Sequence, residues 1–420
     1  MLLKTLLNHV EKHKSFVYKE SRLIKSKTSI SSESEIEILI EPRKNGYARC
    51  SGCGQSRPGY DRLPQRRFDY VPLWGMAVVF LYAMRRVDCP LCGVTVEEVP
   101  WARGKSPLTK SFSRFLAVWA RRLSWAEVAS VFKTTWNRVY DAVEWVVLYG
   151  LENQDLTDIT AIGIDEIAYK KGHKYLTLVY QLEPGKRRLL WLGKDRKETT
   201  LRNFFLWFGE KRSKALRVVC SDMWKPYLNV IRECAKGTLH ILDRFHIMAN
   251  LNKALDEVRR DEANRLKEEG KEPILKHSRW CILKRVKNLT KKQFTKLREL
   301  LAYNLTTMKA YLVKEDFQQF WEYTYAANAG KFLDAWCLRT MRSKMEPMKK
   351  IARSLREHRE LILNWFKAKK DFSSAAVEGL NNKVKTTVKK SYGFKTDEVL
   401  EIALYHTLGD LPLPPTTHEF

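Results

Sequence analysis

The sequence predicts an α+β protein of several domains, in which a small cysteine-bound module and a helical segment precede a mixed sheet. Three observations predict this class: two Cys-x-x-Cys-Gly motifs near the start, a group of β-rich segments in the middle, and a long charged helical stretch after them. The 420 residues exceed one ordinary domain, for which about 150 residues is a reasonable prior. We therefore expect two or three folded domains.

The charge balance favours a polyanionic partner. Lys and Arg number 76 and Asp and Glu number 48, which gives a formal net charge of +28. An excess of this size indicates nucleic acid first and an anionic membrane surface second. No run approaches the roughly 18 apolar residues of a membrane span, and the apolar start is too short for a signal peptide. We expect a cytoplasmic, nucleoid-associated protein.

Four cysteines near the start have the spacing of metal ligands. A two-residue spacer lets one tight turn present two sulfurs, and the trailing glycine lets the backbone fold around them. The motifs predict a structural zinc ribbon over residues 49–105 with an inserted hairpin around residues 68–84. A redox role is less well supported, because no thioredoxin-like context surrounds either pair. The predicted ligands of this Zn²⁺ are Cys50, Cys53, Cys89 and Cys92.

The segments on either side of the ribbon differ in pattern. Residues 1–48 are expected to be a basic lead-in with one strand over residues 35–40. Residues 106–152 have helical period, and Ser124 with Glu127 three residues later forms a capping-box pattern at the start of a helix. We interpret this segment as a DNA-binding helix-turn-helix, whose second helix exposes Asn137 and Arg138 to bases. An ordinary helical hairpin is the alternative.

The middle of the chain predicts one mixed sheet over residues 153–243. The order β-β-β-α-β-α-β indicates an antiparallel meander followed by a βαβ arrangement, as in sheets of the ribonuclease-H type. Residues 244–370 predict only amphipathic helices, and a last helix begins near residue 373 within a final segment, 371–420. The expected strands are residues 159–168, 175–182, 188–192, 216–220 and 238–242, with helices over 198–211 and 226–235.

Three aspartates follow predicted strands of this sheet. Asp165 ends the first strand, Asp222 follows the fourth and Asp243 ends the last. Because the first and fourth strands are neighbours in such a sheet, we expect Asp165 and Asp222 to converge. Clustered carboxylates repel one another and are usually held together by hard divalent cations. Aspartates that merely cap strand ends and following helices are the alternative.

The last helix carries a polar stripe. Glu378, Asn381, Asn382 and Lys385 follow the spacing i, i+3, i+4 and i+7, which places them on one face. A carboxylate, two amides and an ammonium suit a metal–phosphate environment. A solvated helix face is the alternative.

Taken together in this order, these motifs resemble the ISL3 family of bacterial insertion-sequence transposases, of the DDE class. The resemblance covers nearly the whole chain and implies a ribonuclease-H-like core interrupted by an α-helical insertion. It implies that Asp165, Asp222 and Glu378 bind two Mg²⁺ or Mn²⁺ ions. It also implies supporting roles for Asp243 and His246, and DNA contacts by Asn381 and Lys385, of which Lys385 would bind a phosphate.

The function implied by this resemblance is binding of the inverted-repeat ends of an insertion sequence, followed by metal-dependent phosphodiester hydrolysis and strand transfer. The partners would be double-stranded DNA, both transposon ends and target, and a second copy of the chain in a dimer or larger assembly. Two alternatives stay open. One is a non-enzymatic regulator that uses only the ribbon and helix-turn-helix, and the other is a structure-specific nuclease of the same fold.

Overall fold

The computed structural model describes residues 3–25, 34–44, 46–170, 172, 174–368, 374–391, 394 and 396–415. The chain divides into two compact units, of which one comprises Met1–Asp155 with Thr387–Phe420 and the other Leu156–Thr386. The predicted last segment, residues 371–420 with a core helix and a tail, is divided between the two units at Thr387.

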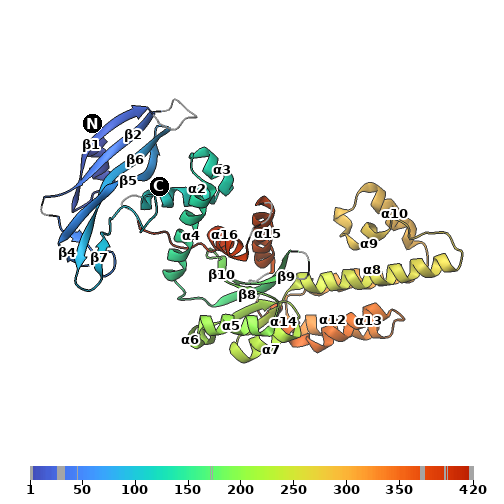
Figure 1. Ribbon diagram of the computed structural model, residues 1–420. Helices are drawn as coiled ribbons and strands as arrows, with labels where there is room; N and C mark the ends of the chain where they lie inside the picture. The colour runs from blue at the N-terminus through green and yellow to red at the C-terminus, as the bar shows by residue number, and fades with distance from the viewer. Residues whose placement is uncertain are drawn as a thin grey trace. The chain divides into compact units, whose positions relative to one another are not determined.

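The N-terminal unit is built on a five-stranded sheet (Figure 1). Its order is β1-β2-β6-β5, with β7 paired to β6, and β2 runs parallel to β6 while the other pairs are antiparallel. The predicted strand over residues 35–40 is confirmed as β2, and the hairpin expected around residues 68–84 extends over 59–89. The strands are β1 (Phe16–Lys25), β2 (Ser34–Pro42), β5 (Gly59–Leu73), β6 (Met76–Cys89) and β7 (Gly93–Val96).

Residues before the ribbon therefore form part of its sheet and supply two strands, although the sequence predicted a lead-in with only one strand. Only the start of β1 is buried, at Phe16 and Tyr18. The rest of the strand is mostly polar, so the sequence lacks the apolar alternation that would have predicted it. The core beneath this sheet centres on Trp101, which is fully buried with edge-on contacts to Phe16 and Tyr82 at centroid distances of 4.8 and 5.3 Å. Helix α1 (Leu3–Val10) adds Leu7 to the same core.

Four helices complete the N-terminal unit. The capping box predicted at Ser124 and Glu127 is present at the start of α3, and Lys133, at φ 50°, lies in the turn before α4. Helices α2, α3 and α16 all pack on α4. A Cβ at Gly150 of α4 would lie 2.6 Å from the Leu411 side chain, so the final segment passes close to this helix. The helices are α2 (Lys110–Ala120), α3 (Trp125–Val131), α4 (Trp136–Glu152) and α16 (Asp397–Leu408).

The second unit contains a five-stranded mixed sheet of order β10-β9-β8-β11-β12. The first three strands form an antiparallel meander, and β11 runs parallel to both β8 and β12. The expectation that the first and fourth strands are neighbours is confirmed. The strands are β8 (Ala161–Lys170), β9 (Lys174–Gln181), β10 (Arg188–Lys194), β11 (Val218–Ser221) and β12 (Leu239–Leu242).

Helices cover both faces of this sheet (Figure 1). Helices α5 (Glu198–Phe208) and α7 (Lys225–Cys234) bury their apolar sides against one face, and α15 (Ser374–Lys390) lies on the other. The helix expected over residues 198–211 ends at Gly209, whose φ of 85° suits glycine, and a short α6 (Glu210–Ala215) follows.

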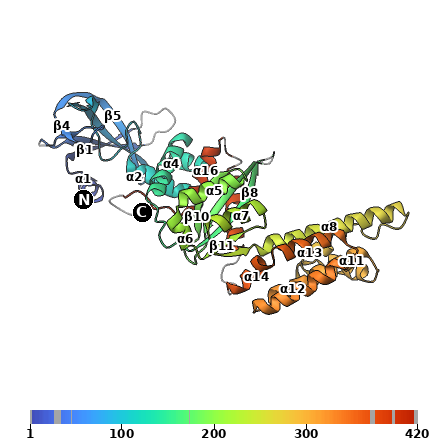
Figure 2. The same ribbon diagram turned by 90° about the horizontal axis from the view of Figure 1, so that it is seen from below.

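The described residues between 244 and 368 contain helices and no strand, as the sequence predicted. Helix α8 packs on α11 and α13, and Figure 2 shows these helices gathered beside the sheet. Helix α14 lies along the edge strand β12, where the Asn364 amide donates a hydrogen bond of 2.8 Å to the His240 carbonyl. The helices are α8 (Arg244–Glu268), α9 (Arg279–Leu283), α10 (Lys291–Leu301), α11 (Thr306–Gln318), α12 (Ala326–Met341), α13 (Glu346–Glu357) and α14 (Arg359–Lys367). None of the helices in the described ranges is long and apolar enough to cross a membrane.

Candidate metal centres

The four predicted cysteines come together in the N-terminal unit. Their Sγ atoms all lie within 4.8 Å of one another, and those of Cys53 and Cys89 are 3.7 Å apart. Zinc–sulfur bonds of about 2.3 Å in a tetrahedron place the sulfurs roughly 3.8 Å from each other. Cys50 and Cys53 lie in the turn between the short strands β3 (Ala48–Arg49) and β4 (Ser56–Arg57), and Cys89 ends β6. The quartet is therefore compatible with Zn²⁺.

The surroundings of the quartet fit a closed metal site. A Cβ at Gly52 would lie 2.8 Å from the Cys92 sulfur, so only glycine lets the first turn approach the second. The Thr95 hydroxyl lies 3.2 Å from the Cys50 sulfur, and this hydrogen bond lowers the pKa of the Cys50 thiol. A lower pKa favours the thiolate, which is the form that binds metal.

The carboxylates of the second unit gather at the end of the sheet where the parallel strand β11 stops. We call this group, which comprises Asp165, Glu166, Asp222 and Asp243, the acidic edge. Gly163 of β8 pairs with Cys220 of β11 in parallel register, and Asp165 and Asp222 each follow that pair by two residues. Parallel strands lie about 4.8 Å apart, so the two aspartates emerge from the sheet side by side. The expected convergence of these two positions therefore follows from the strand register.

Asp165 is held by two side chains from distant parts of the chain. One carboxylate oxygen accepts a hydrogen bond from the Asn381 amide of α15, whose own oxygen accepts one from the Tyr180 hydroxyl at 2.7 Å. The other oxygen lies 3.6 Å from Nε2 of His246 in the first turn of α8. That nitrogen is also 3.8 Å from Asp243, whose carboxylate caps α8 by accepting a hydrogen bond from the Phe245 amide.

The interaction with Asp165, together with the nearby charges of Asp243 and Asp222 and against the opposing effect of burial, raises the pKa of His246 to about 9. The imidazole is therefore an imidazolium at neutral pH. It lies between two carboxylates and balances part of their charge.

A second cation, Arg196, offsets the negative charge of Glu166 and Asp222. The Arg196 guanidinium lies 2.6 Å from Glu166 and 3.5 Å from Asp222, and it stacks over the Trp224 ring at 4.5 Å. Burial, with repulsion from Asp222, raises the pKa of Glu166 to about 7, although Arg196 opposes this shift. The sequence analysis assigned no role to Arg196 or Glu166. The adjacency of Glu166 to Asp165 was a usable signal, whereas the position of Arg196 depends on the loop after β10.

Helix α15 approaches this edge at Gly163. A Cβ there would lie 2.6 Å from Cγ2 of Val377, so the helix packs directly on β8. The predicted polar stripe is divided by this packing: Asn381 is only 6% exposed, whereas Glu378, Asn382 and Lys385 are exposed. The buried amide of Asn381 binds Asp165 and Tyr180, and its contact with DNA stays a prediction.

Two further observations concern the predicted site residues. Among the described residues, the cysteine quartet is the only group of three or more potential ligands whose donor atoms lie within 4.8 Å of one another, so the carboxylates are more widely spaced than in a closed metal site. Of the predicted base-reading residues, Asn137 is exposed, whereas Arg138 forms an ion pair of 2.8 Å with Asp69.

A cysteine quartet compatible with zinc, an acidic sheet edge and a strongly basic chain are typical of proteins that act on nucleic acid with metal ions. The comparison with protein families narrows this class. The model of the ISL3 type of DDE transposase, described as "Transposase", matches residues 162–404, a range that contains Asp165, Asp222 and Glu378. The chain belongs to this family of insertion-sequence transposases, which cut and transfer DNA.

Curated relatives agree with this assignment. The transposase for insertion sequence element IS1557 of Mycobacterium tuberculosis (strain CDC 1551 / Oshkosh) is 28% identical over 407 residues, covering 90% of each chain. The transposase for insertion sequence element IS1001 of Bordetella parapertussis is 26% identical over 366 residues, covering 86% of this chain and 89% of the relative. The similarity therefore extends over both units.

Proposed function

We propose that this protein binds the inverted-repeat ends of its insertion sequence and catalyses metal-dependent phosphodiester hydrolysis and strand transfer, with Asp165, Asp222 and Glu378 as the metal ligands. The observation that carries the proposal is the acidic edge: Asp165 within β8 and Asp222 directly after β11 lie at the same level of adjacent parallel strands, and α15 packs on the strand that bears Asp165. The strand order β10-β9-β8-β11-β12 supports a ribonuclease-H-like core.

The position of Glu378 follows from its neighbours in α15. Glu378 adjoins Val377, which packs on Gly163, and it precedes Asn381, which binds Asp165, by three residues. Side chains at i and i+3 of a helix have Cβ atoms about 5–6 Å apart. Glu378 is thus one helical turn before the residue that binds Asp165, and we propose that a rotamer change or a small movement of α15 brings the carboxylates together.

The donor set suits hard divalent cations. Carboxylate oxygens are the ligands that Mg²⁺ and Mn²⁺ prefer. When bound, a pair of such ions activates the attacking oxygen and stabilises the leaving oxygen at phosphorus. The protein's own groups orient this site: Asn381 fixes the Asp165 carboxylate, and His246 and Arg196 keep the acidic edge neutralised until ions bind.

DNA binding is proposed for three basic or helical parts of the chain. In the N-terminal unit, the helices α3 and α4 would act as a helix-turn-helix, with Asn137 as an exposed reader. In the second unit, residues 271–303 carry ten Lys and Arg against two Glu. Lys385 is exposed on α15 for a phosphate contact. Because binding to phosphates releases counterions, affinity for DNA should fall steeply with salt.

We further propose that the protein works as a dimer or larger assembly on DNA in the cytoplasm, since two transposon ends must be processed together. Cleavage of duplex DNA that carries the element's own ends, with Mg²⁺ or Mn²⁺ present, tests the whole proposal. Cleavage followed by a strand-transfer product supports it. Specific binding without cleavage under every metal condition would instead favour a regulator, and cleavage without transfer would favour a structure-specific nuclease.

A further inference from the structure

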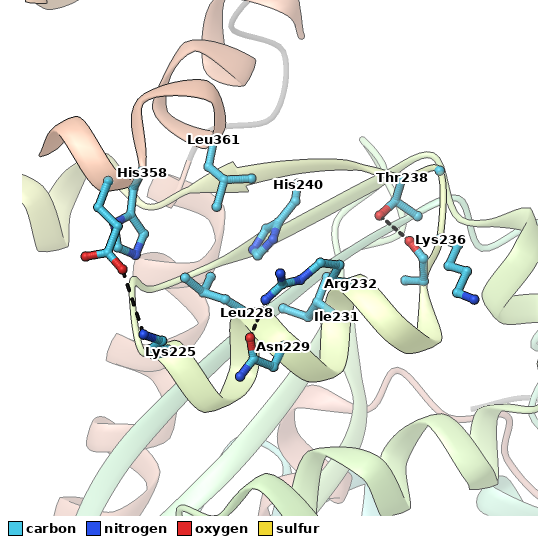
Figure 3. A pocket seen from close by; sticks show the side chains of 13 residues that line it. Lys225, Leu228, Asn229, Ile231, Arg232, Lys236, Thr238, His240, His358 and Leu361 are labelled. Carbon is cyan, nitrogen blue, oxygen red and sulfur yellow. Dashed lines mark hydrogen bonds and ion pairs between the residues drawn. The ribbon is translucent and has the colours of Figure 1, made fainter. Parts of the chain in front are cut away.

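The second unit contains a pocket that the proposed chemistry does not use. A cavity of about 490 Å³ lies between α7, the start of β12 and the junction of α13 with α14 (Figure 3). Its walls combine three kinds of groups: cationic side chains, two imidazoles and an apolar surface. This volume is large enough for a ligand of nucleotide size.

Cations line one side of the pocket. Lys225, Arg232 and Lys236 stand against a single carboxylate, Glu357, which lies 3.9 Å from Lys225. The Arg232 guanidinium donates to the Asn229 side-chain oxygen, which leaves most of its donors available. Within the described residues, Lys236 has no acidic partner. The pocket therefore has an excess of positive charge suited to a phosphate group.

An imidazole forms the inner wall. His240 is 7% exposed, and Figure 3 shows its ring near the centre of the pocket beside Leu228 and Arg232. The Ser221 hydroxyl donates to the Asp222 carbonyl oxygen at 2.9 Å, so at 2.7 Å it accepts its other hydrogen bond from Nε2–H of His240. Burial lowers the pKa of His240 to about 4, and the nearby His358 contributes to this shift.

His240 is therefore neutral, and Nδ1 is a bare acceptor. No partner for this nitrogen exists within the described part of the chain. A ligand in the pocket that donates a hydrogen bond to Nδ1 would supply the partner that this acceptor lacks in the protein. His358 is oriented in a similar way, since its Nδ1 lies 2.9 Å from the Ser354 carbonyl and Nε2 remains for a ligand.

The rest of the wall is apolar. Leu228, Ile231 and Leu361 supply this apolar surface. A flat ring can pack on such a surface while its edge meets the imidazole and a linked anion meets Arg232 and Lys236. We propose that this pocket binds a nucleotide, with a base that carries an amino group against His240 and the phosphate against Arg232 and Lys236.

The pocket is connected with the acidic edge through short covalent and hydrogen-bonded links. His240 bonds to Ser221, which directly precedes Asp222, and Lys225 follows Asp222 by three residues. A ligand that reorients His240 therefore acts on the backbone that positions Asp222. The inference does not depend on the catalytic assignment, since binding can be measured without metal and without cleavage.

Calorimetric titration of the full-length protein in Mg²⁺-free buffer tests this inference, with dAMP, inorganic phosphate and deoxyadenosine as separate probes. We expect dAMP to bind more tightly than either fragment, since only dAMP engages both sides of the pocket. Arg232→Gln and Lys236→Gln should each weaken dAMP binding about tenfold or more, because each removes a charge-assisted contact. Lys186→Gln, in the turn between β9 and β10, is the matched control and should leave binding unchanged.

A second variant addresses the apolar wall. Leu228→Trp should fill the cavity and block dAMP, and its far-ultraviolet circular dichroism should match that of the parent protein. Equal affinity for dAMP and inorganic phosphate, or dAMP binding that persists in Arg232→Gln and Leu228→Trp, would overturn the inference. Competition by a single-stranded oligonucleotide, lost in the same variants, would identify the ligand as a nucleotide of DNA. Binding of dAMP without such competition would identify a free nucleotide.

Discussion

Replacement of Gly163 by alanine should lower both the stability of the second unit and its cleavage activity. The added Cβ would lie 2.6 Å from Cγ2 of Val377 and 3.1 Å from the nearer methyl of Leu182. Carbon atoms pack at about 3.5–4.0 Å, so Val377 must retreat by roughly 1 Å. A valine in a helix has essentially one favoured rotamer, so the backbone of α15 has to move with it.

Both stability and chemistry should respond. Overpacking of this kind costs about 1–3 kcal/mol of unfolding free energy. A displacement of about 1 Å at Glu378, the next residue, should slow cleavage by about 100-fold, because reacting groups tolerate little misplacement. Thermal unfolding and single-turnover cleavage of an end-bearing duplex measure the two effects, and a mobility-shift assay shows whether end binding is retained.

The companion substitution Val377→Ala provides an internal check. It removes the clashing methyl, so Gly163→Ala combined with Val377→Ala should recover cleavage relative to Gly163→Ala alone. Residues in contact usually show coupling energies of about 0.5–3 kcal/mol. If Gly163→Ala cleaves at the parental rate with an unchanged unfolding temperature, then α15 does not deliver Glu378 by packing on β8 and the reasoning is refuted.

Three other outcomes are expected. Asp165→Asn and Glu378→Gln should each reduce cleavage below detection while leaving mobility-shift affinity for the ends within about threefold; loss of binding in both would show that these side chains are structural. Cys50→Ser should abolish zinc retention after gel filtration and lower the stability of the N-terminal unit, since structural zinc contributes folding free energy; Cys234→Ser is the control that keeps the metal. In Mg²⁺-free buffer, His246→Gln should change the pH profile of thermal stability. The pKa of His246 in the folded protein is about 9, above its usual 6.5. The stabilisation that the charged imidazole gives to the folded state is therefore full below pH 6.5 and disappears as the pH rises through 9. A parent-minus-variant difference that is flat between pH 6.5 and 9 would contradict this charge state.

The elements with strong periodicity could be predicted from the sequence. The strands of the second unit and their neighbours follow from apolar runs bounded by turn residues, and the helices after residue 244 follow from amphipathic spacing. Strand β1 was missed because only Phe16 and Tyr18 at its start face the core. A strand whose later residues are mostly polar has too weak an alternation to be recognised without its partner strand.

The acidic edge was predictable only in part. The nearness of Asp165 and Asp222 follows from strand order, and Asp222 follows its strand as predicted. The prediction that Asp165 ends the first strand is wrong, because β8 continues to Lys170 in its pairing with β9. Asn381 was placed on an exposed stripe, yet Val377, Leu380, Asn381 and Val384 have the spacing i, i+3, i+4 and i+7 and are all buried. The apolar members of that set could have shown that Asn381 faces the sheet.

The position of Arg196 had no comparable signal. Its guanidinium meets Glu166, Asp222 and Trp224 only because the loop after β10 folds back over the strand ends. Such a contact joins residues that are far apart in the chain and depends on loop geometry, which residue types alone do not specify.

The N-terminal unit takes its closing pieces from the other end of the polypeptide, and this has a consequence for biosynthesis. Residues 387–420 belong to that unit, α16 packs on α4, and Leu411 occupies the space above Gly150. A ribosome that adds about 5–20 residues per second needs on the order of 10–50 s to make residues 156–420. During that interval the nascent chain already carries the cysteine quartet, but α4 still lacks its contacts with α16 and Leu411, so this unit matures only after these later residues have been made.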